Sequence, residues 1–122
     1  MSVLFAAVFL SSAATPQIRI DAGGVGSGAF LADTDFSGGT VATSTNAIAF
    51  PAAVLNPVPT EVYQTERWSA FTYTVPGLIG GQAYTVRLHF AEVYWTAVGQ
   101  RELNVPINGT QVPTNFDIVK AA

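Results

Sequence analysis

The chain contains no cysteine, which excludes disulfides, thiolate zinc sites and cysteine nucleophiles together. It is also poor in charge: charged residues make up 11% of its 122 residues, whereas most soluble domains have about 25%. The few bases are scattered, so no basic stripe is present to displace counterions from nucleic-acid phosphates. No apolar run approaches the ~20 residues that cross a bilayer as a helix. We therefore expect neither a nucleic-acid partner nor a membrane span.

The first 17 residues differ from the rest of the chain. Residues 3–10 form an uninterrupted apolar run, and small residues and Pro16 follow it. This order is typical of a signal peptide with its cleavage site, although no Lys or Arg precedes the run. A buried strand left from an upstream module is the alternative. We therefore divide the chain into residues 1–17, a signal peptide or upstream remnant, and one domain over residues 18–122, and expect a secreted or cell-surface protein.

Beyond residue 17, apolar and polar residues alternate with the period of two that is typical of half-buried strands. The predicted strands cover residues 18–21, 30–33, 47–50, 70–75, 84–91 and 102–107. A proline-rich loop is predicted at residues 51–59, and Asn108-Gly109 predicts a type I′ hairpin turn. No stretch keeps a helical period over ten residues, apart from the apolar run near the N-terminus. The pattern predicts an all-β chain, with antiparallel strands in a β-sandwich or jelly roll.

Two segments combine aromatic rings with charged groups where a predicted strand meets a loop. They are YQTERW at residues 63–68 and HFAEVYW at residues 89–95. A pyranose ring presents an apolar C–H face and a rim of hydroxyls, so a protein holds it with aromatic faces and a few polar groups. The two segments therefore predict a carbohydrate-binding site.

Five blocks, in this order, resemble the malectin domain family. They read IRIDAGG (18–24), ADTDFSGG (32–39), YQTERW (63–68), LHFAEVYW (88–95) and ING (107–109). The resemblance covers residues 18–122 and implies a jelly-roll-like, galactose-binding-like β-sandwich that binds carbohydrate through aromatic residues on loops. It further implies a glucose-containing oligosaccharide or polysaccharide as ligand. Related bacterial modules occur in large secreted or surface proteins, so it also implies an attached enzyme or surface-protein module as neighbour.

Carried over position by position, the resemblance assigns sugar contacts to Tyr63, Tyr94 and Trp95. A further binding tyrosine of the family should fall near residues 43–46, where this chain has Thr, Ser, Thr and Asn. The family normally continues through more strands after residues 115–118, with a late aspartate that contacts the sugar. The resemblance thus predicts a sandwich that lacks its last strands.

Each aromatic candidate also has a plainer interpretation. Tyr63 could be a core tyrosine whose hydroxyl bonds a neighbouring loop. In a regular strand Tyr94 and Trp95 would point to opposite faces, whereas from a strand end both could project toward one ligand. We favour the core for Trp68, and His89 falls on the polar face of its predicted strand.

Glu66, Arg67 and Glu92 are the charged candidates for ligand binding. We favour a bracing role for them, with Arg67 paired to Glu92 or to another carboxylate. The closely spaced Asp33 and Asp35 could hold calcium, but side-chain bonding within a turn explains them better. We expect no cofactor and no metal.

A non-catalytic carbohydrate-binding module is the leading interpretation of these features. The alternative is a structural or protein-interaction β-sandwich of a secreted or surface protein that has lost sugar binding. A glycoside hydrolase would need two suitably separated carboxylates, and Glu66 with Glu92 is the one pair near the aromatics. Because nothing in the sequence sets their separation or raises a pKa, we do not expect an enzyme.

Overall fold

The computed structural model describes residues 7–12, 15–50, 57–111 and 115–121. Strands dominate these residues, and the two helices have four residues each, which confirms a mostly β chain. The elements in chain order are β1 (Ala7–Ser12), β2 (Thr15–Asp21), β3 (Phe36–Thr43), α1 (Thr60–Tyr63), β4 (Thr65–Tyr73), β5 (Thr85–His89), β6 (Pro106–Ile107), β7 (Thr110–Gln111) and α2 (Ile118–Ala121).

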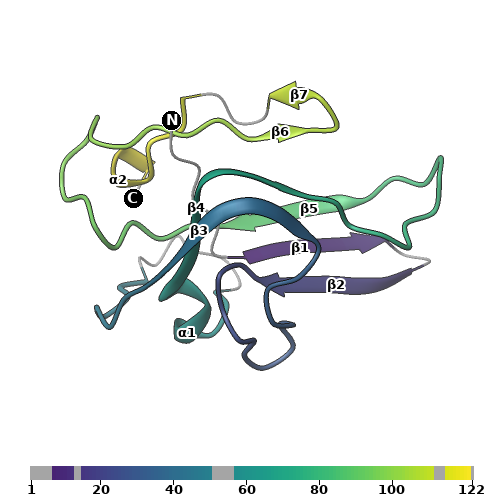
Figure 1. Ribbon diagram of the computed structural model, residues 1–122, viewed down its shortest axis with the longest axis horizontal. Coiled ribbons are helices and arrows are strands. Elements are labelled where there is room, and N and C mark those ends of the chain that lie inside the picture. Colours follow the sequence, from purple (N-terminus) through teal and green to yellow (C-terminus); the bar gives the residue numbers. More distant parts are fainter. Residues whose placement is uncertain (1–6, 13–14, 51–56, 112–114, 122) are drawn as a thin grey trace.

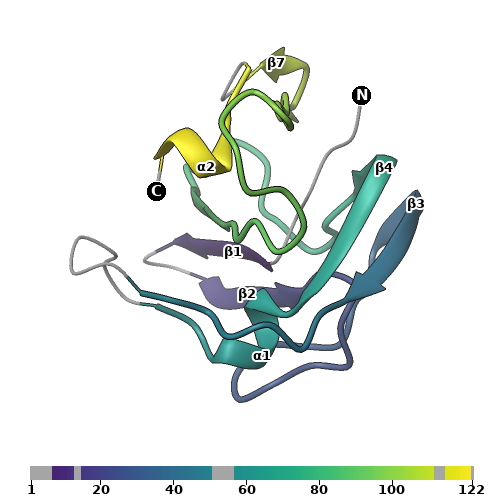
Figure 2. The same cartoon turned by 90° about the vertical axis from the view of Figure 1, so that its left-hand side faces the viewer.

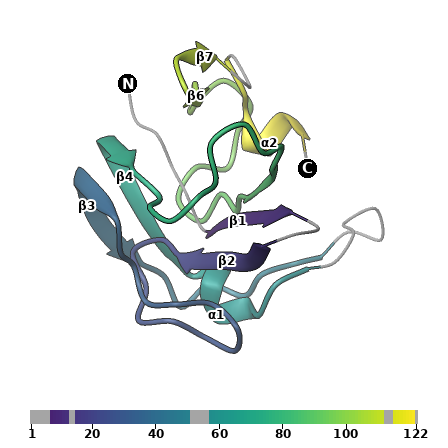
Figure 3. The ribbon, with the colours of Figure 1, turned by 90° about the vertical axis from the view of Figure 1, so that its right-hand side faces the viewer.

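The strands form one three-stranded sheet and two two-stranded sheets, all antiparallel. In the three-stranded sheet β1 lies between β2 and β5, and the three strands run side by side in Figure 1. Figure 2 shows β3 and β4 as a separate pair beside that sheet, with α1 at one end of β4. In Figure 3 the β6–β7 hairpin and α2 lie on the opposite side of the three-stranded sheet from α1.

The core follows the alternation seen in the sequence. Its buried residues are Ala22, Leu103, Val105 and Ile118, and the inward faces of β4 and β5 pack against them. In both strands half-buried side chains alternate with exposed ones, as period-two patterning requires. Phe30 and Val62 form a second, smaller cluster of buried side chains.

Several strand predictions are confirmed. Residues 18–21 lie in β2, and the strands predicted at 70–75 and 84–91 correspond to the end of β4 and to β5. Of residues 102–107, Leu103 forms an isolated bridge with Phe116, and β6 covers the last two positions.

The predicted strands at residues 30–33 and 47–50 are wrong. Phe30 and Leu31 make isolated bridges, and residues 44–50 have no regular secondary structure. Conversely, β3 was not predicted. Its central Gly38 and Gly39 take positive φ values of 79° and 78°, so the strand lacks the side-chain alternation that would reveal it.

The Asn108-Gly109 turn is confirmed, with φ values of 49° and 83° between β6 and β7. Of the proline-rich loop predicted at 51–59, residues 57–59 have no regular structure and the remainder lies outside the described residues. The apolar run at 3–10 overlaps β1, whose register pairs it with both β2 and β5. Among the described residues, neither helix is long and apolar enough to cross a membrane.

Candidate functional site

A cavity of about 780 Å³ opens at the end of β5, where three distant segments meet. Residues 46–50 form one wall, the loop of residues 90–96 forms the second, and the C-terminal residues 116–121 contribute the third. Tyr63, the last residue of α1, also lines it. Of the six residues predicted to bind ligand, this cavity brings together Tyr63, Glu92, Tyr94 and Trp95.

The loop that carries the aromatic pair is bent by Glu92. The backbone N–H groups of Tyr94 and Trp95 both donate to Glu92 Oε1, at 3.0 and 3.1 Å. β5 ends at His89, so within the residues that the structure describes the backbone N–H groups beyond it have no partner strand to accept their hydrogen bonds. The Glu92 carboxylate accepts two of them instead, which allows the chain to turn. The loop therefore departs from strand geometry at the two aromatic positions.

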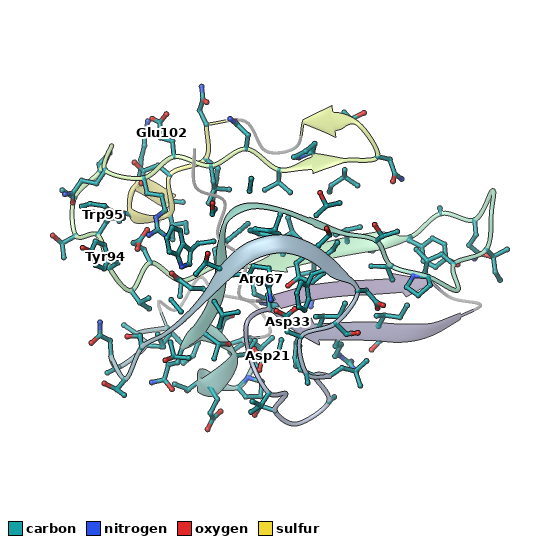
Figure 4. All side chains as sticks on the ribbon, viewed as in Figure 1. Asp21, Asp33, Arg67, Tyr94, Trp95 and Glu102 are labelled. Atoms are coloured by element: carbon teal, nitrogen blue, oxygen red, sulfur yellow. The ribbon has the colours of Figure 1, made fainter. Side chains whose placement is uncertain are left out.

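Tyr94 and Trp95 consequently do not point to opposite faces of a strand. Their ring centroids are 4.8 Å apart and their planes meet at 84°, an edge-to-face pair. Tyr94 is 72% exposed and Trp95 is 36% exposed, values at which large rings remain accessible to a ligand. Figure 4 shows both side chains on the loop at the left of the molecule.

Asn46 fastens the first wall of the cavity to the aromatic loop. Its side-chain nitrogen donates to the Val93 carbonyl at 3.0 Å, and its own carbonyl accepts from Gln64 Nε2 at 2.9 Å. Gln64 in turn accepts from the Ser44 N–H at 2.8 Å through its backbone carbonyl. Through Gln64, the YQTER segment thus holds the wall that Asn46 joins to the aromatic loop.

Tyr63 lies at the inner side of the cavity and is 6% exposed. Its hydroxyl is 3.2 Å from His89 Nδ1, and its ring meets those of Phe50 and His89 edge to face. Burial, followed by the charge of Arg87, lowers the pKa of His89 below its usual range. In the neutral tautomer that carries its proton on Nε2, His89 can accept a hydrogen bond from the Tyr63 hydroxyl at Nδ1. Although His89 falls on the polar face predicted for its strand, it is buried, because Tyr63 and Phe30 cover it.

Arg67 does not line the cavity. Its Nε and Nη2 donate to Asp33 Oδ2 at 3.0 and 2.7 Å, its Nη1 donates to the Gly38 carbonyl at 2.8 Å, and it stacks on the Phe36 ring. The Tyr73 hydroxyl donates to the other Asp33 oxygen at 2.6 Å, and burial together with that carboxylate raises the pKa of Tyr73. This is the predicted bracing of Arg67 by a carboxylate, with Asp33 as the partner.

Glu66 also lies outside the cavity lining and is 8% exposed. Burial raises its pKa, the nearby positive charge of Arg101 lowers it, and the charge of Glu92 raises it further. Arg101 instead pairs directly with Glu92, with Nε 3.2 Å from Oε2. Glu92 thus pairs with a base nine residues beyond it in sequence rather than with Arg67.

The core position predicted for Trp68 is wrong, since its side chain is 37% exposed on β4. Asp33 and Asp35 lie at bends, and the predicted bonding within a turn is wrong for Asp33, because its carboxylate accepts from the distant Gly23 N–H at 2.7 Å as well as from Arg67 and Tyr73. In the described part of the chain, no group of three His, Asp or Glu side chains is placed to hold a metal ion.

Sequence reasoning missed Asn46, Phe50 and Arg101. Phe50 falls in a segment that the pattern predicts to be a strand, and Arg101 stands apart from the aromatic blocks, so neither carries a local motif. A signal for Arg101 is present: Glu92 in an apolar segment needs a cation when buried.

The family model described as the malectin domain matches residues 17–122. The chain belongs to the malectin domain family. This is a family of non-catalytic, lectin-like carbohydrate-binding modules. Searches of curated proteins and of solved structures returned no significant match.

Proposed function

We propose that this malectin domain binds a glucose-containing oligosaccharide or polysaccharide in the 780 Å³ cavity, without catalysis. The observation that carries the proposal is the Tyr94–Trp95 pair, whose two rings are exposed on one loop beside the cavity. The volume falls within the roughly 300–1,000 Å³ usual for small-molecule sites. Rings held by the backbone bend at Glu92 are preorganised, which reduces the entropy lost when a sugar stacks on them.

The polar groups needed for hydroxyl recognition are few and lie at defined places. Asn46 and Thr96 line the cavity beside the aromatic rings, and Glu92 lines it with a buried carboxylate that holds the loop. Glu66 and Arg67, which do not line it, act as bracing in this proposal. Stacking supplies most of the affinity, so single-site binding is weak, and an attached enzyme or surface module would raise the effective affinity by multivalency.

Calorimetric titration with glucose, maltose and nigerose tests the proposal. Trp95→Ala and Tyr94→Ala should each weaken binding about fivefold, since one stacked ring contributes about 1 kcal/mol. The matched control is Trp68→Ala, which removes the other exposed indole from a position outside the cavity. Equal affinity in the two cavity variants and the parent would refute the aromatic platform.

A protein-interaction domain is the second candidate function. It is favoured by the apolar character of two walls, at residues 47–50 and at Phe116, Ile118, Val119 and Ala121. A folded sample that binds none of the three sugars would support this candidate. Hydrolysis of aryl glycosides that is lost in Glu92→Gln would contradict both.

The finer fold and the cellular location are part of the same proposal. We propose a jelly-roll-like sandwich built around the described strands, in a protein that is secreted or held at the cell surface. The apolar run at residues 3–10 supports export, although it also overlaps the central strand β1. The apolar run is either a cleaved signal peptide or a strand of the mature domain, and the intact mass of the product from a secreting host distinguishes them. Loss of residues 1–17 supports cleavage, and a retained Met1 refutes it.

A further inference from the structure

The aromatic loop depends on one carboxylate for its shape. Glu92 Oε1 accepts two backbone N–H groups, those of Tyr94 and Trp95, and so fixes the direction in which both side chains leave the chain. A carboxylate that accepts several N–H bonds does so best when ionised, because charge-assisted hydrogen bonds are roughly twice as strong as neutral ones.

That carboxylate is itself hidden from solvent. The side chain of Glu92 is 4% exposed, and Glu66, a second buried carboxylate, is close enough for the charge of Glu92 to raise the pKa of Glu66. Burial of an ionised carboxylate is costly unless a cation compensates it. Some nearby positive charge must therefore keep Glu92 in place.

Arg101 supplies this charge. Its side chain is 12% exposed, its Nε lies 3.2 Å from Glu92 Oε2, and its charge also lowers the pKa of Glu66. The Oε2–Nε contact lacks hydrogen-bond geometry, so the pair is held by charge more than by a directed bond. Arg101 does not line the cavity, which separates it from direct contact with a ligand there.

We propose that Arg101 is a positioning residue for the Tyr94–Trp95 platform and acts through Glu92. Arg101 neutralises one carboxylate oxygen, the other oxygen holds the two N–H groups, and the rings stay in their edge-to-face pair. This inference rests on the proposed sugar site. It adds that sugar binding there depends on the buried charge of Arg101, which lies outside the cavity.

The experiment uses the full chain with Trp68→Phe, which leaves Trp95 as its one tryptophan. In this parent, Arg101→Met should shift Trp95 emission to the red, reduce the near-ultraviolet dichroism of the Tyr94–Trp95 pair, and weaken maltose binding about tenfold. Arg101→Lys keeps the charge and should restore much of both signals. Arg87→Met, the same change of charge and shape on the exposed face of β5, is the matched control and should leave both unchanged.

A double-mutant cycle shows whether Arg101 acts through Glu92. In a Glu92→Gln background the neutral amide no longer needs a cation, so Arg101→Met should there cost less than twofold in affinity. An equal loss in both backgrounds would overturn the proposal, as would an unchanged Trp95 spectrum in Arg101→Met. If Arg101→Met unfolds, Arg101→Gln takes its place as the neutral variant, and an unchanged Trp95 spectrum and affinity in Arg101→Gln would overturn the proposal.

Failure of the proposed function is distinguishable from failure of this inference. A parent that binds no sugar refutes the sugar site, while the Trp95 spectra of Arg101→Met and Arg87→Met still test the positioning. A parent that binds maltose, with Arg101→Met at the same affinity, refutes the positioning alone.

Discussion

Gly23 follows β2 in the IRIDAGG block and is held by contacts that leave no room for a side chain. Its φ is 76°, and a Cβ at this position would lie deep inside van der Waals contact with the Glu66 carbonyl oxygen. Its N–H donates to Asp33, which also holds Arg67. The glycine thus allows the β2 loop to approach β4 closely.

Gly23→Ala should therefore destabilise the domain far more than Gly77→Ala. Gly77 has nearly the same φ, 78°, but nothing lies within 4 Å of the point that an added Cβ would occupy. Both variants incur the cost of a left-handed alanine, about 1–2 kcal/mol, and Gly23→Ala should lose roughly 1–3 kcal/mol more through overpacking. Urea unfolding of both variants measures the difference. Equal losses would show that the close approach to Glu66 relaxes easily.

Some of the residues that form the cavity could be predicted from the sequence, and others could not. Tyr63, Tyr94 and Trp95 were predicted from the order of the family blocks, and all three line the cavity. The partner of Glu92 was not predicted, because Arg101 reaches it through the folding of a loop. Sequence spacing predicts partners within a helix or along a strand, and this pair lies in neither.

At the level of elements, Arg67 joins β4 to β3 and to the Asp33 loop. Its guanidinium makes three hydrogen bonds, two to one Asp33 oxygen and one to the Gly38 carbonyl, and lies 3.5 Å from the centre of the Phe36 ring. Figure 4 shows Asp21, Asp33 and Arg67 together near the middle of the molecule, well apart from Tyr94 and Trp95. This cluster therefore stabilises the β3–β4 pair rather than the cavity.

Arg67→Lys should destabilise the fold although it preserves the charge. A lysine ammonium cannot reproduce the fork of donors or the planar stacking on Phe36. We expect a loss of about 2–4 kcal/mol, close to that for breaking a buried ion pair. Thermal unfolding checks the loss, and Arg87→Lys on the exposed face of β5 is the control, expected within about 0.5 kcal/mol of the parent. A small effect of Arg67→Lys would show that charge alone holds the cluster.

Among the elements, β5 and the end of β4 were predictable because each alternates between a packed and an exposed face. The strand β3 was not, since Gly38 and Gly39 interrupt any alternation. The segment 47–50 has the apolar composition of a buried strand, but its apolar residues line a cavity instead. An apolar composition predicts that these residues avoid water, but it does not predict whether they face the core or a cavity. The helices α1 and α2 have four residues each, too few to show a helical period.

For the molecule as a whole, stability should depend on pH through the chain's single histidine. Burial, with the charge of Arg87, lowers the pKa of His89, while the unfolded chain binds this proton near pH ~6.5. Between the two pKa values the folded state holds fewer protons than the unfolded state. The free energy of unfolding should therefore decrease as pH falls below about 6.5, with a slope of at most about 1.4 kcal/mol per pH unit.

His89→Asn isolates this contribution. The amide oxygen can still accept from the Tyr63 hydroxyl, and it does not titrate. The variant should be less stable than the parent at pH 8, because it fills less volume beside Tyr63 and Phe30. The difference should shrink as pH falls from 7 toward 5.

Asp21 and Glu66, whose pKa values are raised by burial, contribute with the opposite sign, since their stabilisation is lost as pH rises. Both carboxylates are present in the parent and in His89→Asn, so their contributions cancel in the difference between the two free energies of unfolding. Urea unfolding at half-unit pH steps measures it, and a difference that stays constant from pH 8 to 5 would mean that His89 takes up its proton without cost to the fold.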